Sequence, residues 1–231
     1  MEFKEKIKEN YFRILESIEK ACEKSGRSRE EIKILGASKK QSPEKIKRVY
    51  ELGVYIFGEN YVQEAEKKIE VLKEFPIEWH FIGRLQTNKV KKALKLFSCI
   101  QTLDRFSLAQ EIQKQAEKLN LKVPVMIEIN IGKETTKGGI FPEKLEKFIE
   151  EIKNFNRIRI IGLMCLPPLE ENPEKVRPYF QKMRYLFEKI KSYMGYEFRE
   201  LSMGTSYDFM IAIEEGATII RIGEALFGKR D

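Results

Sequence analysis

Short apolar runs alternate with amphipathic segments along almost the whole chain, and this alternation limits the possible folds more than any other feature. Eight such runs lie at residues 32–38, 54–57, 79–82, 99–103, 123–131, 158–165, 198–203 and 218–222. Most are apolar on both faces, as is typical of parallel strands covered by helices. Because doubly wound sheets usually have fewer strands, eight strand–helix units predict a closed (β/α)8 TIM barrel.

The chain begins with a segment that stands outside this alternation. Apolar residues recur at helical spacing from Phe3 to Cys22, which predicts an extra N-terminal helix packed against the barrel. Ser42 and Asp104 are predicted to cap the helices that follow them. No linker rich in Pro, Gly or Ser divides the chain, so we expect a single domain over residues 1–231.

Composition excludes several classes of protein. Hydrophobic residues make up 42% and charged residues 34% of the chain, which is globular rather than disordered. No apolar stretch could span a membrane, and the N-terminus lacks the apolar core of a signal peptide. The three cysteines show neither disulfide nor zinc spacing, so we expect a cytoplasmic protein without a metal site. The net charge of +7 comes from 43 basic residues interleaved with 36 acidic ones, so nucleic acid is not an expected partner.

In a (β/α)8 barrel the functional site lies at the C-terminal ends of the strands. The polar residues predicted at those ends are Ser38–Lys39, Glu59–Asn60, Thr102–Asp104, Asn130, Ser202–Ser206 and Arg221–Glu224. The only histidine, His80, lies inside the third run between Trp79 and Phe81. A lone histidine among aromatic residues is more often structural than a metal ligand.

Lys39 is the most informative of these residues. Leu35, Ala37 and Lys39 share one face of a strand, so Lys39 projects into the barrel mouth if Leu35 points inward. Barrel walls would lower the pKa of a shielded lysine and leave a free amine that attacks aldehydes. An ordinary surface lysine is the alternative, and position alone favours it.

The last two strand ends predict an anion site. Residues 202–208 and 221–224 each combine a glycine with the start of a helix, where backbone N–H groups can bind phosphate. Alternatively, Thr205 and Asp208 form only a capping box. Arg221 lies among isoleucines and must find a partner if buried, for which a structural ion pair is the simplest choice.

At these motifs the sequence resembles the pyridoxal phosphate homeostasis proteins, small relatives of the N-terminal barrel of alanine racemase. The matching segments are LGASK (35–39), FGENYVQE (57–64), EWHFIG (78–83), LQTNK (85–89), GLM (162–164), LSMG (201–204) with Ser206, and RIG (221–223) with FG (227–228). They occur in the family's order and cover nearly the whole chain.

The resemblance implies pyridoxal 5′-phosphate (PLP) as cofactor, held as a Schiff base on Lys39. Arg221 would face the pyridine nitrogen, and Asn60 would line the pocket. The other cofactor-binding residues implied, chiefly through backbone amides near the phosphate, are Ser202, Met203, Gly204, Ser206, Gly223 and Glu224. Thr205 and Glu224 depart from the family pattern, and a Glu224 carboxylate turned toward the phosphate would weaken binding.

The resemblance also implies a role in vitamin B6 and amino-acid homeostasis. An arginine at the pyridine nitrogen makes PLP a poorer electron sink, and racemisation needs a second acid/base group. The chain ends at Asp231, which leaves no room for the second domain that alanine racemase uses. We therefore expect a monomeric PLP binder whose partners include PLP-dependent apoenzymes. A weak amino-acid racemase is the main alternative, and a barrel for another phosphorylated metabolite is a third.

Overall fold

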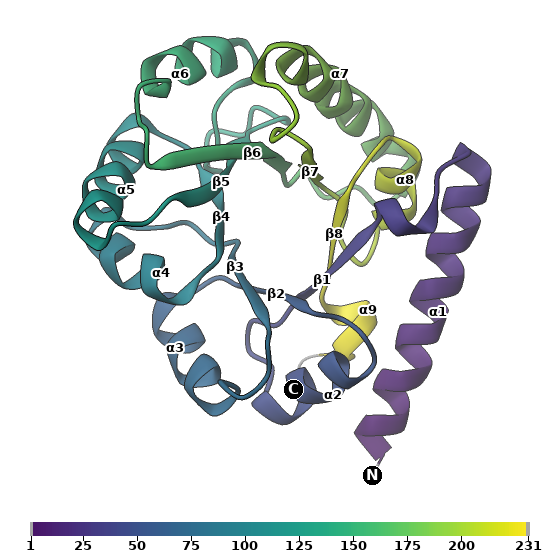
Figure 1. Cartoon of the computed structure of the whole chain (residues 1–231). Helices are drawn as coiled ribbons and strands as arrows, with labels where there is room; N and C mark the ends of the chain where they lie inside the picture. The colour runs from purple at the N-terminus through teal and green to yellow at the C-terminus, as the bar shows by residue number, and fades with distance from the viewer. Residues whose placement is uncertain (1, 230–231) are drawn as a thin grey trace.

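The computed structural model describes residues 2–229, and in it eight parallel strands close into a barrel (Figure 1). Each strand pairs with its neighbours in the chain, and β8 pairs with β1 to complete the ring. The strands are β1 (Lys33–Ala37), β2 (Ile56–Glu59), β3 (Glu78–Phe81), β4 (Cys99–Leu103), β5 (Val123–Ile129), β6 (Ile158–Cys165), β7 (Glu200–Ser202) and β8 (Ile219–Ile222). The predicted TIM barrel is confirmed.

Helices surround this barrel. They are α1 (Glu2–Ser25), α2 (Pro43–Glu51), α3 (Val62–Val71), α4 (Val90–Leu96), α5 (Phe106–Leu119), α6 (Leu145–Ile152), α7 (Arg177–Met194), α8 (Phe209–Glu214) and α9 (Glu224–Phe227), with 3₁₀ turns η1 (Arg29–Glu31), η2 (Thr87–Lys89), η3 (Pro142–Lys144) and η4 (Pro173–Val176). As predicted, α1 packs outside the ring, against α2, α8 and α9. Within residues 2–229, no helix is long and apolar enough to cross a membrane.

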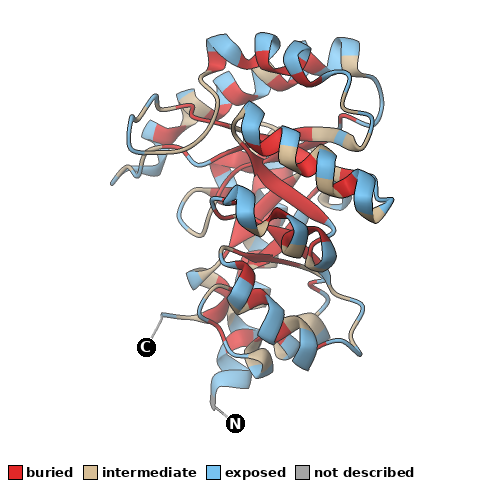
Figure 2. Ribbon diagram, turned by 90° about the vertical axis from the view of Figure 1, so that its left-hand side faces the viewer, coloured by how far each residue is buried: buried red, intermediate tan, exposed pale blue. Residues whose placement is uncertain are grey.

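The strands separate two apolar cores. Their outward faces pack against the helices, and Figure 2 shows the buried residues on the strands and on the inner faces of the helices. The second core fills the barrel and contains Leu35, Met126, Met164 and Ile219. The Leu35 face of β1 therefore points inward, which is the condition under which Lys39 projects into the barrel mouth.

The predicted cap at Ser42 is present, but the one at Asp104 is wrong. The Ser42 hydroxyl accepts from the Lys45 N–H, whereas α5 begins at Phe106 with no side-chain cap. The Asp104 carboxylate instead accepts a hydrogen bond from the Arg105 guanidinium, which also donates to a backbone carbonyl. An adjacent cation that is already held in place therefore outcompetes the helix N–H groups for this carboxylate.

Strand β2 begins two residues later than its apolar run suggests. Val54 is buried before pairing starts, and the strand continues to Glu59, which is fully buried. The run marks burial and not strand pairing. The shift places a carboxylate inside the fold beside the candidate site.

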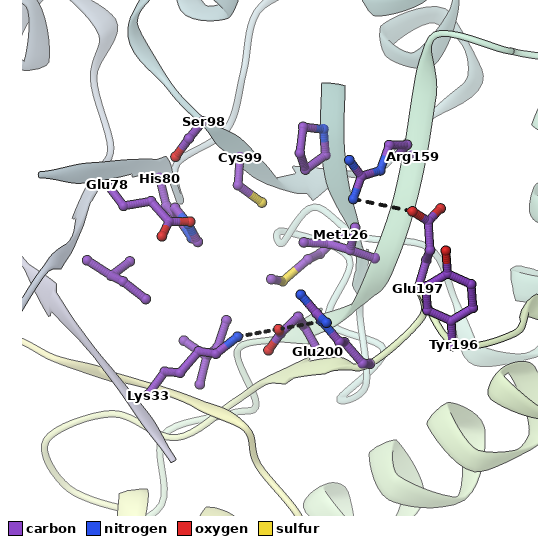
Figure 3. A pocket seen from close by; sticks show the side chains of 15 residues that line it. Lys33, Glu78, His80, Ser98, Cys99, Met126, Arg159, Tyr196, Glu197 and Glu200 are labelled. Carbon is purple, nitrogen blue, oxygen red and sulfur yellow. Dashed lines mark hydrogen bonds and ion pairs between the residues drawn. The ribbon is translucent and has the colours of Figure 1, made fainter. Parts of the chain in front are cut away.

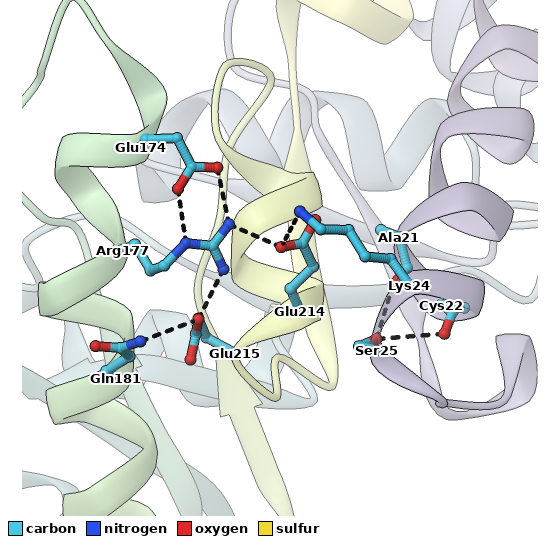
Figure 4. A network of polar contacts seen from close by, with 9 residues as sticks. All are labelled: Ala21, Cys22, Lys24, Ser25, Glu174, Arg177, Gln181, Glu214 and Glu215. Carbon is cyan, nitrogen blue, oxygen red and sulfur yellow. Dashed lines mark hydrogen bonds and ion pairs between the residues drawn. The ribbon is translucent and has the colours of Figure 1, made fainter.

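Arg177 joins three helices outside the barrel (Figure 4). Its guanidinium donates to Glu174, Glu214 and Glu215 at 2.7–2.8 Å, and Lys24 from α1 also binds Glu214. Burial opposes ionisation of Glu214, but these two cations lower its pKa overall. The network fixes α1 and α8 against the start of α7.

Candidate functional site

A cavity of about 230 Å³ opens at the C-terminal ends of the strands. Six of the predicted site residues line it: Lys39, Asn60, Ser206, Arg221, Gly223 and Glu224. Three others, Ser202, Met203 and Gly204, are buried in the wall behind it. The wall also contains Ala37, Ile82, Glu128, Met164, Leu166, Thr205 and Tyr207.

Lys39 lies in the turn that follows β1, and a buried ionic cluster fixes this turn. The Lys68 ammonium, from α3, donates to the Ser38 carbonyl and to the carboxylates of Glu59 and Glu64, each at 2.7 Å. Glu64 also accepts from the Lys40 backbone N–H. Both chain neighbours of Lys39 are therefore anchored, and Lys39 itself lines the cavity.

Two carboxylates share this one buried ammonium. Lys68 is 6% exposed and Glu59 is fully buried, and Glu59 also accepts from the Ser38 hydroxyl at 2.6 Å. Burial raises the pKa of Glu59, although Lys68 and Ser38 oppose that shift. Glu64 is less buried, so the hydrogen bonds from Lys68 and Lys40 outweigh desolvation and lower its pKa. The Lys68 charge is thus required to keep the cluster compensated.

The predicted anion loops after β7 and β8 meet at Ser206. The Ser206 hydroxyl oxygen accepts from the backbone N–H groups of Gly223 and Ala225, at 3.2 and 3.1 Å. These two donors converge on one oxygen at the start of the last helix, as they would on a phosphate oxygen. The serine oxygen occupies both donors here, and its own hydrogen is left to donate toward an anion in the cavity.

Gly204 forms the turn that delivers Ser206. Its φ is +90°, and a Cβ at this position would lie 2.5 Å from the Ala212 Cβ, so a side chain is excluded. The Thr205 N–H and hydroxyl both donate to the Asp208 carboxylate. Only half of the predicted capping box is present, because the Asp208 N–H donates to the Thr205 carbonyl and not to its hydroxyl, and α8 begins at Phe209 without a side-chain cap; the half that is present occupies the Thr205 amide.

Arg221 is buried in the cavity floor, and the predicted structural ion pair is absent from the described part of the chain. Its guanidinium donates to the Ser202 hydroxyl at 2.9 Å and to the Cys165 carbonyl at 2.8 Å, and within residues 2–229 no carboxylate lies within salt-bridge distance of it. Burial lowers its pKa from the usual value. A cation held only by neutral groups suits an anionic or electron-rich ligand in the cavity.

Glu128 is a cavity residue that sequence analysis did not select. Burial, with the nearby Asp104 charge, raises the pKa of Glu128 to about 7, although Arg221 and Arg84 oppose that shift. The sequence feature that could have identified Glu128 is a single carboxylate at an inward position of an otherwise apolar strand. It gives the cavity an acid/base group that changes charge near neutral pH.

Asn130 and His80 lie outside the cavity. The Asn130 side chain binds backbone groups of its own loop. His80 lies at the opposite end of the barrel, where it lines a second pocket beside Glu78 (Figure 3). It hydrogen-bonds to Glu78 and to Gln101. No group of three or more His, Cys, Asp or Glu side chains within the described chain could hold a metal ion.

The donor set of the cavity fits a small phosphorylated aldehyde. Lys39 brings a primary amine, the loops at Ser206 and Gly223 bring anion-binding donors, and Arg221 brings a buried cation. Ala37, Ile82 and Met164 add apolar walls suited to a flat ring.

Comparison with known proteins supports this interpretation. The family model for the alanine racemase N-terminal domain matches residues 36–231. The pyridoxal phosphate homeostasis protein of Aquifex aeolicus is 51% identical over 222 residues, which cover 96% of this chain and 97% of that protein.

Solved structures with the same fold include a PLP-bound relative. PipY of Synechococcus elongatus, solved with PLP bound, is 30% identical with a TM-score of 0.79, covering 92% of this chain and 100% of PipY. Alanine racemase from Clostridium difficile is 18% identical with a TM-score of 0.75, covering 95% of this chain and 56% of the racemase. The racemase likeness is one of fold alone.

Proposed function

Because the chain belongs to the pyridoxal phosphate homeostasis protein family, we propose that it binds PLP in the cavity at the C-terminal end of the barrel and holds it covalently on Lys39. The observation that carries this proposal is the shared cavity: the Lys39 amine, the Arg221 guanidinium and the loops at Ser206 and Gly223 all line it. PLP supplies an aldehyde that forms a Schiff base with a primary amine.

Each cavity residue then has a physical task. The Ser206 hydroxyl, held in place by the Gly223 and Ala225 N–H groups, donates its own hydrogen to the phosphate beside the start of α9. Arg221 donates toward the pyridine nitrogen, and Asn60 borders the ring beside Lys39. Ser202, Met203 and Gly204 support the site from behind, since Ser202 binds Arg221 and Gly204 shapes the phosphate turn.

In the cell, the proposed role is PLP homeostasis by binding the cofactor and releasing it to PLP-dependent apoenzymes. We propose a monomer that acts as one domain in the cytoplasm. The three cysteines support that compartment, because all are buried free thiols.

A weak PLP enzyme, such as an amino-acid racemase, is the second candidate, and Glu128 is the observation that favours it. A cavity carboxyl with a pKa of about 7 could act as the second acid/base group beside Lys39. The PLP-loaded protein should be incubated with single amino-acid enantiomers in deuterated water. A carrier incorporates no solvent deuterium at Cα at enzyme-like rates, whereas incorporation that is lost in Glu128→Gln would establish the enzyme.

Substitution of Lys39 tests the proposed attachment. Lys39→Ala should abolish the visible absorption band that equimolar PLP gives with the unaltered protein, because no other amine is expected at the ring. Lys40→Ala is the matched control, since Lys40 is adjacent in sequence but exposed, and it should keep the band. A full band in Lys39→Ala would show that Lys39 does not carry the cofactor.

Glu224→Gln should strengthen PLP binding. The Glu224 carboxylate lines the cavity and accepts from the Tyr207 hydroxyl at 3.3 Å, close to the proposed phosphate position. Removing one like charge near the phosphate should gain about 1 kcal/mol, or roughly fivefold in the dissociation constant. Pyridoxal, which lacks the phosphate, is the control ligand. An equal gain for pyridoxal would show that the carboxylate does not act on the phosphate.

A further inference from the structure

A continuous chain of buried hydrogen bonds crosses the interior of the barrel from the cofactor cavity to the opposite end. Arg221 donates to the Ser202 hydroxyl at 2.9 Å, and Ser202 donates to the Gln101 side-chain oxygen at 2.7 Å. The Gln101 amide contacts His80 Nδ1 at 2.8 Å, and His80 Nε2 contacts the Glu78 carboxylate at 2.8 Å. The four residues from Arg221 to His80 are at most 6% exposed.

With a neutral His80, the two ends of this hydrogen-bond chain fix the direction of every bond within it. A guanidinium only donates and a carboxylate only accepts. Ser202 must therefore accept from Arg221 and pass its own hydrogen to Gln101, whose NH₂ group then faces His80. His80 accepts at Nδ1 and carries its proton at Nε2, toward Glu78. The hydrogen bond from His80 lowers the pKa of Glu78, which keeps this end an acceptor.

Burying these polar groups in an apolar barrel interior is unfavourable compared with filling the same space with apolar side chains, which suggests a functional role for the hydrogen-bond chain. The barrel interior around it is apolar, with Leu35, Met126 and Met164 in one cluster. Apolar side chains could fill the same space without any polar group to satisfy, whereas a fully satisfied polar network rigidifies its members. At the far end, Lys33 pairs with Glu200 and Arg159 with Glu197, so the charges of that pocket are largely compensated (Figure 3).

We propose that Gln101, His80 and Glu78 are positioning residues for the cofactor site, which hold the Arg221 guanidinium toward the pyridine ring through Ser202. This inference rests on the proposed function. Of the five N–H donors of Arg221, one binds the Ser202 hydroxyl at the end of the hydrogen-bond chain and another binds the Cys165 carbonyl. Both sides of the guanidinium are therefore fixed from the barrel wall. Without Gln101 the Ser202 hydroxyl has no acceptor to set its direction, so one of these two anchors of Arg221 is no longer held in place.

Gln101→Leu tests the proposal, because it interrupts the chain two residues away from Arg221 and does not touch the cavity. The variant should keep the visible band of bound PLP, shift its wavelength and weaken binding about fivefold, as expected when one neutral hydrogen bond is lost and the Ser202 hydroxyl has no acceptor to orient it. Thr102→Val is the matched control. Thr102 is equally buried on the same strand, and its hydroxyl donates to the Gly83 carbonyl outside the chain. It should lower stability with no change in band or affinity.

Glu78→Ala keeps the proposal testable if Gln101→Leu does not fold, since the Glu78 side chain is half-exposed at the rim. Without this acceptor His80 can carry its proton at Nδ1, which turns the Gln101 amide and removes the acceptor of the Ser202 hydrogen. A smaller band shift in the same direction is expected. Unchanged band and affinity in the folded variants, or equal changes in Thr102→Val, would overturn the proposal. Absence of any band in the unaltered protein would instead refute the proposed function.

Discussion

Lys68→Met should lower the free energy of unfolding by about 3–5 kcal/mol, because it removes the ammonium from a buried ionic cluster and leaves its carboxylates uncompensated. Lys68 is 6% exposed and binds Glu59, Glu64 and the Ser38 carbonyl. Methionine fills a similar volume, so the loss should come from charge and hydrogen bonding. The measurement is denaturant unfolding of the protein without cofactor.

Two variants separate this effect from a general cost of losing a lysine. Lys67→Met, at the neighbouring exposed position of α3, should be nearly neutral. Adding Glu59→Gln to Lys68→Met should restore much of the loss, since the fully buried carboxylate is then neutral. A loss below 1 kcal/mol, or no recovery in the double variant, would contradict this account of the cluster.

The loss of stability in Lys68→Met should depend on pH, and the substitution should also weaken PLP binding. Burial already raises the pKa of Glu59, and loss of Lys68 should raise it further. A carboxyl whose pKa is raised on folding costs stability above its unfolded pKa, so the deficit should be largest at neutral and alkaline pH and shrink in acid. PLP binding should weaken as well, because the Ser38 carbonyl before Lys39 loses its anchor.

Glu128→Gln should stabilise the protein by about 2–3 kcal/mol at pH 8, with no gain at pH 4. The folded pKa of Glu128 is about 7, compared with an ordinary value of 4.5. Below the ordinary value both states are protonated, so the residue costs nothing. Between the two values Glu128 is deprotonated in the unfolded chain but still protonated in the folded protein. The free-energy cost of folding with Glu128 therefore grows with pH and becomes constant above about pH 7.

The comparison of unfolding free energies across this pH range checks the prediction. Glu188→Gln is the control, because Glu188 is an exposed residue of α7, and the substitution should show no such pH dependence. A gain that stays constant from pH 4 to pH 8 would mean that the pKa of Glu128 is not raised by folding.

The fold could be predicted from the sequence because its determinants are local and repeated. Each apolar run is short, each is followed by a helical segment, and the period-two pattern of Leu35, Ala37 and Lys39 gives the inward face of β1. The ends of strands were less predictable where a buried residue does not pair in the sheet, as with Val54 before β2. The capping role of Asp104 was mispredicted because the sequence does not show that Arg105 would hold its carboxylate.

The candidate site was predicted in part. Residues that end strands, such as Lys39 and Arg221, could be found because the barrel brings all strand ends to one face. Lys68 lies on a helix and Glu128 lies inside a strand, where the pattern suggests a solvated charge or a core position. Their roles depend on tertiary contacts with Glu59 and Asp104, which no spacing in the chain reveals.

The central claim, that Lys39 carries PLP, is tested most directly by borohydride reduction of the protein loaded with equimolar PLP, followed by mass spectrometry of its peptides. Reduction fixes the cofactor to whichever amine holds it. The account predicts one pyridoxyl group, on Lys39, with the neighbouring Lys40 unmodified. A label on another lysine, or one spread over many lysines, would contradict it.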